Sequence, residues 1–279
     1  EDGGKGATVS VALGRLGVST GYIGKVGYDP WGDMGDTWMS ESGVDTTFMY
    51  RDHSVSTGTG LILIEEDSTN TIIDGDSACQ ALTLEETRNA IEAMKEAKVF
   101  ITGFGMPFKK ALDGAKIAKE EYGMITLCNV SPLPSEEMGD LSFLDYMVLN
   151  DVEARMLCNL PEDSDEENIV IVKKIQEKYN CKGVIMTCSS EGSAILDGEE
   201  FWQVKATPVK AVDTIGAGDG YLAAVAANLI WGKTLHEATE WASKYAAFKV
   251  TRPGSMTKKP GCGYPNKEEV EKFIDSIEE

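Results

Sequence analysis

Histidine and positive charge are scarce in this chain of 279 residues. It contains two histidines, and 46 Asp and Glu residues outnumber 26 Lys and Arg residues, which gives a formal net charge of −20 at pH 7. This acidic balance argues against nucleic acid and an anionic membrane surface as partners. The six cysteines form no C-x-x-C pair, and with so few histidines they do not predict a zinc site. Free thiols in a cytoplasmic protein are the simpler interpretation.

Long apolar runs and several nucleotide-binding motifs are also missing. The longest apolar candidate, residues 221–231, is shorter than the ~20 residues that cross a bilayer and is interrupted by Asn228. Val9 stands where a dinucleotide-binding G-x-G-x-x-G would need its third glycine, and no G-x-x-x-x-G-K-[ST] phosphate loop occurs. Neither His53 nor His236 is flanked by a nucleophile motif, which argues against Ser-His-Asp hydrolysis.

Short apolar runs alternate with stretches of helical spacing along the chain. The pattern predicts α/β architecture, with a mainly parallel central sheet covered by helices on both faces. Ligands of such sheets bind beyond the carboxyl ends of the strands. The expected strands are 98–102, 124–128, 146–149, 183–187 and the β-prone run 204–212, which Pro208 interrupts. The expected helices are 109–122, 152–158, 169–179, 220–227 and 266–279.

One region departs from this alternation. Residues 58–65 and 69–73 are rich in β-formers and are separated by polar residues, so they predict a β-hairpin. The total length suits one large α/β domain or a domain with a small appendage.

The most informative segment is Asp213-Thr214-Ile215-Gly216-Ala217-Gly218-Asp219, which precedes the expected helix at 220–227. Small residues at 216–218 let unpaired N–H groups at a helix start approach an anion, and the helix dipole favours negative charge there. A carboxylate at the rim of such a site suits a base that takes the proton of a hydroxyl attacking a phosphoryl group. The alternative is that Asp213 or Thr214 caps the helix and the glycines only form a turn.

This segment matches D-T-x-G-A-G-D, and the chain resembles the ribokinase-like (PfkB) carbohydrate kinases. Further motifs of that family match in order at 3–8, 12–17, 24–32, 43–45, 56–59, 150–153 and 250–254. The resemblance implies a three-layer α/β/α kinase domain over residues 1–279, with a small β-sheet lid that includes the hairpin at about 55–75. Relatives carry a first strand and further lid strands before the Gly-Gly motif, so we expect an N-terminal segment to be missing from this sequence.

The resemblance implies an ATP-dependent sugar kinase that transfers the γ-phosphoryl group to a primary hydroxyl of ribose or a related pentose or hexose. Asp219 would be the base, and the backbone N–H groups of Gly216, Ala217 and Gly218 would form the anion hole. Two alternatives stay open. One is a kinase for another substrate of the family (fructose, 2-keto-3-deoxygluconate or a nucleoside), and the other is a non-catalytic sugar- or nucleotide-binding protein.

The resemblance also assigns the phosphate end of the site. It implies ATP contacts at Asn150, Thr187, Ser189, Gly192 and Gly218, where Ser189 replaces the usual glycine. Glu153 would act on Mg²⁺ through its water shell, since Mg²⁺ keeps most of its waters. A potassium ion, if the enzyme uses one as activator, would bind at Asp213, Ile215, Arg252 and Gly254, but Lys258 falls near a position where relatives often have a hydroxyl ligand.

The sugar end of the site departs further from the family pattern. The implied substrate contacts are Gly3, Gly4, Lys5, Thr8 and Asp219. Thr8 replaces an asparagine of the ribokinases, and Gly105 replaces a glutamate that contacts ribose. Lys5, Thr57-Gly58-Thr59 and Gly75 nevertheless favour the ribokinase branch over the fructokinase branch. The implied partners are ATP, a small sugar and a second copy of the chain, bound as a homodimer through the lids.

Overall fold

Six strands form the central sheet, in the order β12-β11-β10-β9-β8-β7. The structure, a computed structural model, describes residues 4–64, 70–75, 77–257 and 259–278. Strands β7 to β10 are parallel, and β11 and β12 run antiparallel to their neighbours. The sheet is therefore mainly parallel, as the sequence predicts. The strand bounds are β7 Val99–Gly103, β8 Ile125–Asn129, β9 Tyr146–Asn150, β10 Gly183–Thr187, β11 Ser193–Asp197 and β12 Glu200–Val204.

Alternate residues of the sheet enter two separate cores. Tyr146 and Val148 of β9 pack into one core, and Met147 and Leu149 pack into the other. Successive side chains of a strand point to opposite faces, so burial on both faces requires apolar residues at every position. This explains why the central strands read as continuous apolar runs.

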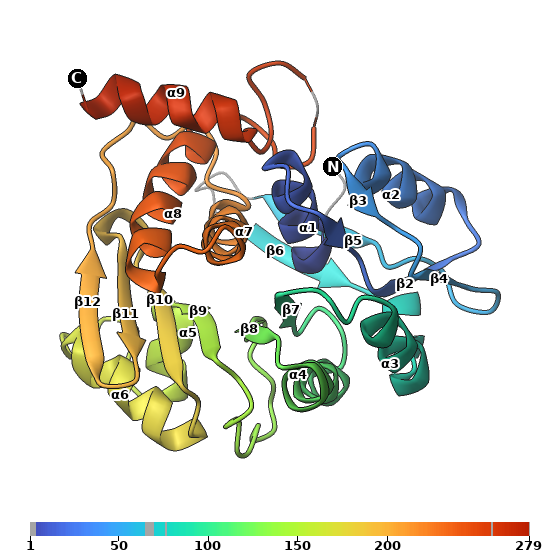
Figure 1. Cartoon of the computed structure of the whole chain (residues 1–279), viewed down its shortest axis with the longest axis horizontal. Coiled ribbons are helices and arrows are strands. Elements are labelled where there is room, and N and C mark those ends of the chain that lie inside the picture. The colour runs from blue at the N-terminus through green and yellow to red at the C-terminus, as the bar shows by residue number, and fades with distance from the viewer. Residues whose placement is uncertain (1–3, 65–69, 76, 258, 279) are drawn as a thin grey trace.

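Helices cover both faces of this sheet (Figure 1). On one face lie α1 (Lys5–Arg15), α7 (Ala217–Ile230) and α8 (Leu235–Val250), with α9 (Lys267–Glu278) packed on α8. The opposite face carries α4 (Phe108–Tyr122), α5 (Asp151–Leu157) and α6 (Asn168–Tyr179). The predicted α/β/α layering is confirmed.

The predicted strand at 204–212 is wrong. Only Val204 belongs to a strand, the end of β12, and residues 205–216 contain no helix or strand. Pro208 lacks the N–H group that a sheet ladder needs. At the far end of the run, the N–H groups of Val212 and Asp213 both donate to the carbonyl of Val250. The segment is therefore held by the end of α8 and not by a neighbouring strand.

Within the described ranges, three two-stranded sheets lie outside the central sheet. Strand β1 (Thr20–Gly21) pairs with β3 (Val44–Asp45), and β2 (Gly24–Gly27) pairs with β4 (Met49–Asp52), both in parallel. Strands β5 (Gly60–Ile64) and β6 (Asn70–Asp74) pair antiparallel, which confirms the predicted hairpin. Its role as a lid stays a prediction. The remaining elements are α2 (Pro30–Ser40), α3 (Leu84–Ala93) and the 3₁₀ turns η1 (Ala78–Ala81) and η2 (Ser189–Glu191).

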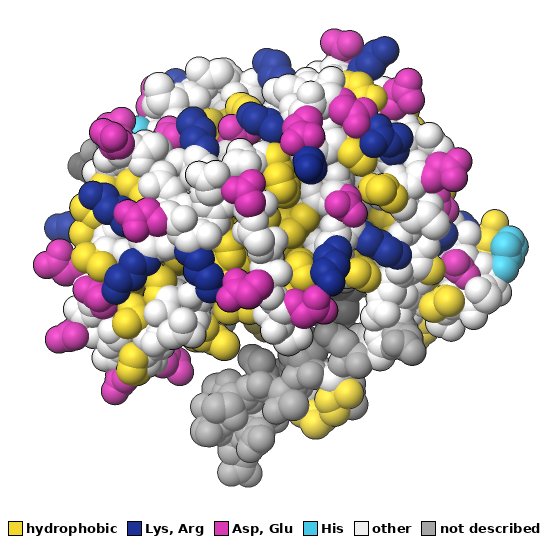
Figure 2. Space-filling model, turned by 90° about the horizontal axis from the view of Figure 1, so that it is seen from below, with side chains coloured by type: hydrophobic (Ala, Val, Ile, Leu, Met, Phe, Trp, Pro, Cys, Tyr) yellow, Lys and Arg dark blue, Asp and Glu magenta, His cyan; other side chains and the backbone are white. Residues whose placement is uncertain are grey.

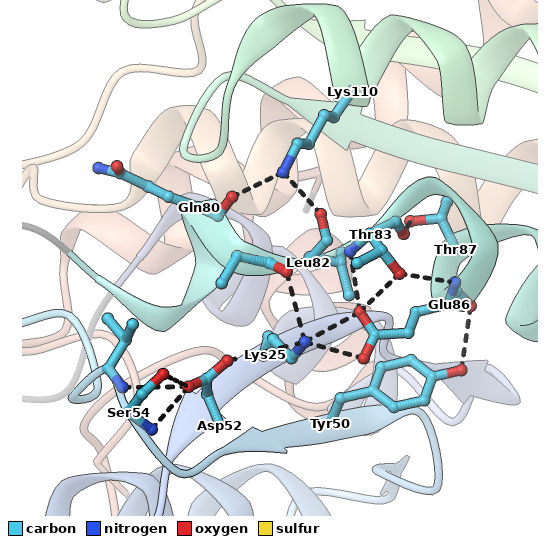
Figure 3. Close-up of polar contacts among 12 residues, drawn as sticks. Lys25, Tyr50, Asp52, Ser54, Gln80, Leu82, Thr83, Glu86, Thr87 and Lys110 are labelled. Atoms are coloured by element: carbon cyan, nitrogen blue, oxygen red, sulfur yellow. Dashed lines mark hydrogen bonds and ion pairs between the residues drawn. The ribbon is translucent and has the colours of Figure 1, made fainter.

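A buried lysine connects the small β2–β4 sheet to η1 and α3 (Figure 3). Lys25 on β2 has a side chain that is 9% exposed, and its ammonium lies 2.8 Å from the Glu86 carboxylate. It also donates to the carbonyl of Ala81 at 3.3 Å. The same carboxylate accepts from Thr83 and so caps α3. Lys25 and its partners therefore connect β2, η1 and α3.

A second carboxylate fixes the entry to the hairpin. Asp29 accepts hydrogen bonds from the N–H and the hydroxyl of Thr57, both at 2.8 Å. It also accepts from the N–H of Gly32 at 2.9 Å and caps α2. These hydrogen bonds, the one from the Thr57 N–H first, lower the pKa of Asp29. Two family motifs, 24–32 and 56–59, therefore meet at one side chain.

Both signs of charge are mixed on the outer face of the α4–α6 layer. Figure 2 shows Lys and Arg interspersed with Asp and Glu there, with apolar side chains between them. Within the part of the chain that the structure describes, no helix is long and apolar enough to cross a membrane.

Candidate active site

The N-terminus of α7 is the place where the sequence predicts the anion hole. Gly216 is the N-cap residue and has a left-handed backbone (φ 75°), and its carbonyl accepts from the hydroxyl of Tyr264 at 2.9 Å. Among the described residues no side chain caps this helix. A Cβ atom on Gly218 would have nothing within 4 Å, so the space over this turn is open. The N–H of Ala217 donates to the carbonyl of Thr214 at 3.1 Å, so the open turn leaves the N–H groups of Gly216 and Gly218 for an anion.

The capping alternative is wrong for Asp213. Its Oδ1 atom accepts from the N–H of Ile215 at 2.9 Å, and its Oδ2 atom accepts from the N–H of Gly254 at 2.8 Å. The carboxylate therefore holds the loop that precedes the helix against residue 254. Thr214 does not cap the helix by its side chain either, because α7 carries no such hydrogen bond within the described residues.

Asp219 lies in the first turn of α7 and is half-buried. One of its oxygens accepts from the hydroxyl of Thr8 at 2.7 Å. Burial raises the pKa of Asp219, while the Thr8 hydrogen bond and the charges of Lys5 and Lys249 act in the opposite direction. A carboxylate with a raised pKa is a better proton acceptor than one in water. The position and the pKa direction both suit a general base.

The contact with Thr8 brings two helix N-termini together. Thr8 lies in the first turn of α1, whose N-cap residue is Gly4 (φ 99°). Helix α1 packs beside α7 in Figure 1, so both helix dipoles place positive potential near the carboxylate. Gly4 and Lys5 are exposed there, as expected of substrate contacts. Gly3 lies outside the described residues.

Thr8 has a role that the sequence did not reveal. Thr8 is only 6% exposed, and its hydroxyl donates a hydrogen bond to the carboxylate of Asp219, the predicted base. The predicted contact of Thr8 with substrate stays a prediction. Gly105, the other departure from the family pattern, is exposed, and its carbonyl accepts from the Cys79 thiol at 3.3 Å.

Strand pairing brings the predicted ATP residues together. Asn150 ends β9, and Thr187 ends β10 directly beside it in register. Thr187 also pairs with Ser193 of β11, whose hydroxyl lies 2.9 Å from the hydroxyl of Tyr221 on α7. The carboxyl ends of β9 and β10 are thus connected to the helix that carries Asp219.

Asn150 and Glu153 form a capping box at the start of α5. The Asn150 amide oxygen accepts from the N–H of Glu153 at 2.7 Å, and the Glu153 carboxylate accepts from the N–H of Asn150 at 2.9 Å. Such a capping box is common at helix starts and does not by itself indicate a ligand site. It leaves the half-buried carboxylate of Glu153 just beyond the end of β9. Its predicted role toward Mg²⁺ stays a prediction.

The turn after β10 contains two predicted ATP residues with positive φ angles, Ser189 and Gly192. Ser189 is exposed and has φ 48°, a left-handed conformation that costs side-chain-bearing residues free energy. Gly192 has φ 104°, and a Cβ atom there would clash with the backbone of Val204. Both predicted ATP residues therefore occupy backbone positions that favour glycine.

The predicted potassium site contains a lysine that the sequence analysis missed. Lys249 is 0% exposed, and its ammonium donates to the carbonyl of Asp213 at 3.2 Å and to the carbonyl of Ile215. The guanidinium of Arg252 is bound to the carbonyls of Cys262 and Gly263 and to Glu269. A lysine in the last turn of the alanine-rich α8 helix, directly before the matched 250–254 motif, was the available signal.

Comparisons with known proteins agree with this geometry. The pattern of the pfkB family carbohydrate kinases matches residues 1–262. A deoxyribokinase of Salmonella typhi and a ribokinase of Haemophilus influenzae are each 26% identical to this chain, over 98% of the chain and 87% of their own length.

Solved structures of ribokinases share the fold. A ribokinase of Thermotoga maritima is 27% identical, with a TM-score of 0.83, and the match covers 98% of this chain and 87% of that one. A ribokinase of Arabidopsis thaliana, complexed with ribose and ATP, is 25% identical with a TM-score of 0.85 and the same coverage. The ribokinase-like fold inferred from the motifs is confirmed.

Proposed function

This chain belongs to the pfkB family of carbohydrate kinases, and from that membership we propose that it transfers the γ-phosphoryl group of ATP to a primary hydroxyl of ribose or a closely related sugar. That it is an ATP-dependent carbohydrate kinase follows from the family and its ribokinase relatives. Which sugar it takes, and how each site residue acts, are the proposed parts.

The observation that carries the proposal is the placement of Asp219 in an open helix N-terminus beside Thr8. The sugar hydroxyl gives its proton to the Asp219 carboxylate as its oxygen bonds to the γ-phosphorus. The bond from that phosphorus to the bridging oxygen breaks, and ADP leaves. The N–H groups at 216–218 stabilise the charge that develops on the phosphoryl oxygens.

The phosphates and base of ATP would lie along the ends of β9 and β10. We assign Asn150, Thr187, Ser189 and Gly192 to this part of the site, because their backbone positions adjoin one another and connect to α7 through Ser193 and Tyr221. Glu153 would act on a Mg²⁺ ion through its water shell. That ion would supply neutralisation of phosphate charge.

Ribose and 2-deoxyribose are the first substrates to test, since relatives of similar identity are named ribokinase and deoxyribokinase. Replacing a polar contact residue changes substrate discrimination strongly, because a buried partner is left unpaired. We therefore expect this chain to differ in sugar preference from ribokinases that carry Glu in place of Gly105 and Asn in place of Thr8. The Thr8 hydroxyl is bonded to Asp219.

A coupled assay of ADP production tests the proposal. The panel contains ribose, 2-deoxyribose, fructose, 2-keto-3-deoxygluconate and a nucleoside, each with ATP and Mg²⁺. Ribose or deoxyribose should give the highest kcat/KM. Binding of sugar and ATP by calorimetry with no turnover of any panel member would favour the alternative, a non-catalytic binding protein.

We also propose that the β5–β6 hairpin is a lid and that two chains pair through it. Leu63 and Ile73 are 47% and 52% exposed, and the register places them on the same face of the hairpin. Pairing would cover this apolar face. Replacing Leu63 with serine should shift sedimentation from dimer to monomer, and unchanged sedimentation would contradict the proposal.

The cytoplasm is the proposed compartment, because ATP is available there and the six cysteines are free thiols. Potassium activation, expected from Asp213, Ile215, Arg252 and Gly254, is not part of this proposal, because the Lys249 ammonium donates to the carbonyls of Asp213 and Ile215.

A further inference from the structure

The carbonyl groups that would bind a potassium ion already bind an ammonium group. Lys249 is fully buried in the last turn of α8, and its Nζ atom donates to the carbonyls of Asp213 and Ile215. These belong to the segment that leads into the anion hole. A positive charge in this turn also matches the negative end of the α8 dipole.

A potassium ion does not fit these residues as they stand. The Asp213 carboxylate, the anionic group of the predicted site, is bound by the N–H groups of Ile215 and Gly254. An ion at the two carbonyls would lie next to the buried ammonium, and two like charges in a poorly solvated site repel strongly. The carbonyl oxygens of Asp213 and Ile215 that face inward need a positive charge to balance them, and the Lys249 ammonium supplies it.

We propose that the Lys249 ammonium takes the place of the activating monovalent cation, so that turnover does not depend on potassium. Lys249 is then a positioning residue, since it acts through the backbone of 213–215 on the N–H groups of 216–218. The carbonyl of Thr214, in the middle of this segment, accepts from the N–H of Ala217, so the segment and the first turn of α7 are directly connected. This role rests on the proposed kinase function.

The first experiment compares potassium with tetramethylammonium chloride at equal ionic strength. The variants are Lys249→Ala, which leaves room for an ion, and Lys249→Met, which removes the charge and fills the space. Lys244→Met is the matched control, because Lys244 lies on the same helix and pairs with Glu278 at the surface. The readouts are kcat and the KM for ATP.

Wild type and Lys244→Met should have the same kcat in both salts. Without potassium, kcat of both Lys249 variants should fall roughly 10–100-fold, since a small misplacement of catalytic groups has effects of this size. Potassium should restore Lys249→Ala and leave Lys249→Met low. A several-fold rise of wild-type kcat with potassium, or variants as active as wild type without it, would overturn the proposal.

Thermal unfolding provides a readout that needs no turnover. The Tm of wild type should be equal in potassium and tetramethylammonium salts, whereas the Tm of Lys249→Ala should rise when potassium is added, because an ion that binds only the folded state stabilises it. A wild-type Tm that rises with potassium would show that the ion binds despite Lys249 and would refute the proposal. This result does not depend on whether any sugar of the panel is phosphorylated.

Discussion

The α7 side and the α1 side of the active site differ in how their residues are held. Around α7, Gly216 is bound by Tyr264, Asp213 by two N–H groups, and Ile215 by Lys249. On the α1 side, Gly4 and Lys5 are exposed, and Thr8 is the residue tied to the opposite helix. Under the proposed function, the firmly held backbone near α7 serves the phosphoryl transfer, and the residues near α1 serve substrate choice. We therefore expect changes near α7 to affect kcat and changes near α1 to affect substrate preference.

Removing the carboxylate of Asp219 should give the largest effect. We expect Asp219→Ala to lower kcat on the order of 10²–10⁴-fold, the range for loss of general base catalysis, with a smaller change in KM. Steady-state kinetics with the preferred sugar measures both. Asp219→Asn, which keeps the shape, serves as the control for folding. A near-normal kcat in either variant would remove Asp219 from the role of base.

A side chain at Gly218 should block the anion hole without harming the fold. Since a Cβ atom there meets no neighbour within 4 Å, Gly218→Val should keep a Tm close to wild type. The kcat should fall on the order of 10²-fold, comparable to the loss of an oxyanion-hole donor.

Gly216→Ala is the matched comparison on the same turn. Its left-handed backbone and the nearby Tyr264 hydroxyl predict a loss of at least about 1 kcal/mol in the free energy of unfolding. If Gly216→Ala and Gly218→Val lost stability equally, the inference that a side chain has room at position 218 but not at position 216 would be wrong.

The pH dependence tests the connection between the two sides. The Thr8 hydrogen bond lowers the pKa of Asp219 against the effect of burial. Removing it in Thr8→Val therefore raises that pKa. Because the base must be ionised, the acid limb of kcat/KM should move to higher pH. Thr8→Ser keeps the hydroxyl and should keep the wild-type pH profile. If the acid limb of kcat/KM did not move in Thr8→Val, the hydrogen bond from Thr8 would have no influence on the pKa of the base.

The smallest effect concerns stability at the ATP side. Ser189→Gly should raise the free energy of unfolding by about 1 kcal/mol, because glycine adopts φ 48° without strain. Urea unfolding monitored by circular dichroism measures this. Ser190→Gly, on the same turn, lacks a positive φ and should be neutral or destabilising. Equal effects of the two substitutions would contradict the strain at Ser189.

The residues near α7 were predictable because their geometry is local. The spacing of Gly216, Gly218 and Asp219 alone indicates an open helix start, and the structure has one. The strands β7 to β10 were predictable because strands buried on both faces leave continuous apolar runs. Their positions in the chain agree with the predicted ones to within one residue.

What the sequence concealed depends on contacts between distant segments. Lys249 acts on carbonyls more than thirty residues away, and Thr8 reaches Asp219 across 211 positions. The strand expected at 204–212 failed for the same reason, since Val212 and Asp213 bond to Val250 at the end of α8. A pattern within one segment of the sequence does not indicate which distant residue that segment will contact.

The anchoring of Thr57 by Asp29 has a mechanical consequence for the hairpin. With both its N–H and its hydroxyl bound, residue 57 belongs to the rigid body that includes α2. If the hairpin moves as the proposed lid, its backbone must rotate between this anchored residue and the start of β5 at Gly60, where Gly58 lies. The Asp29 carboxylate would then fix the point about which the lid turns.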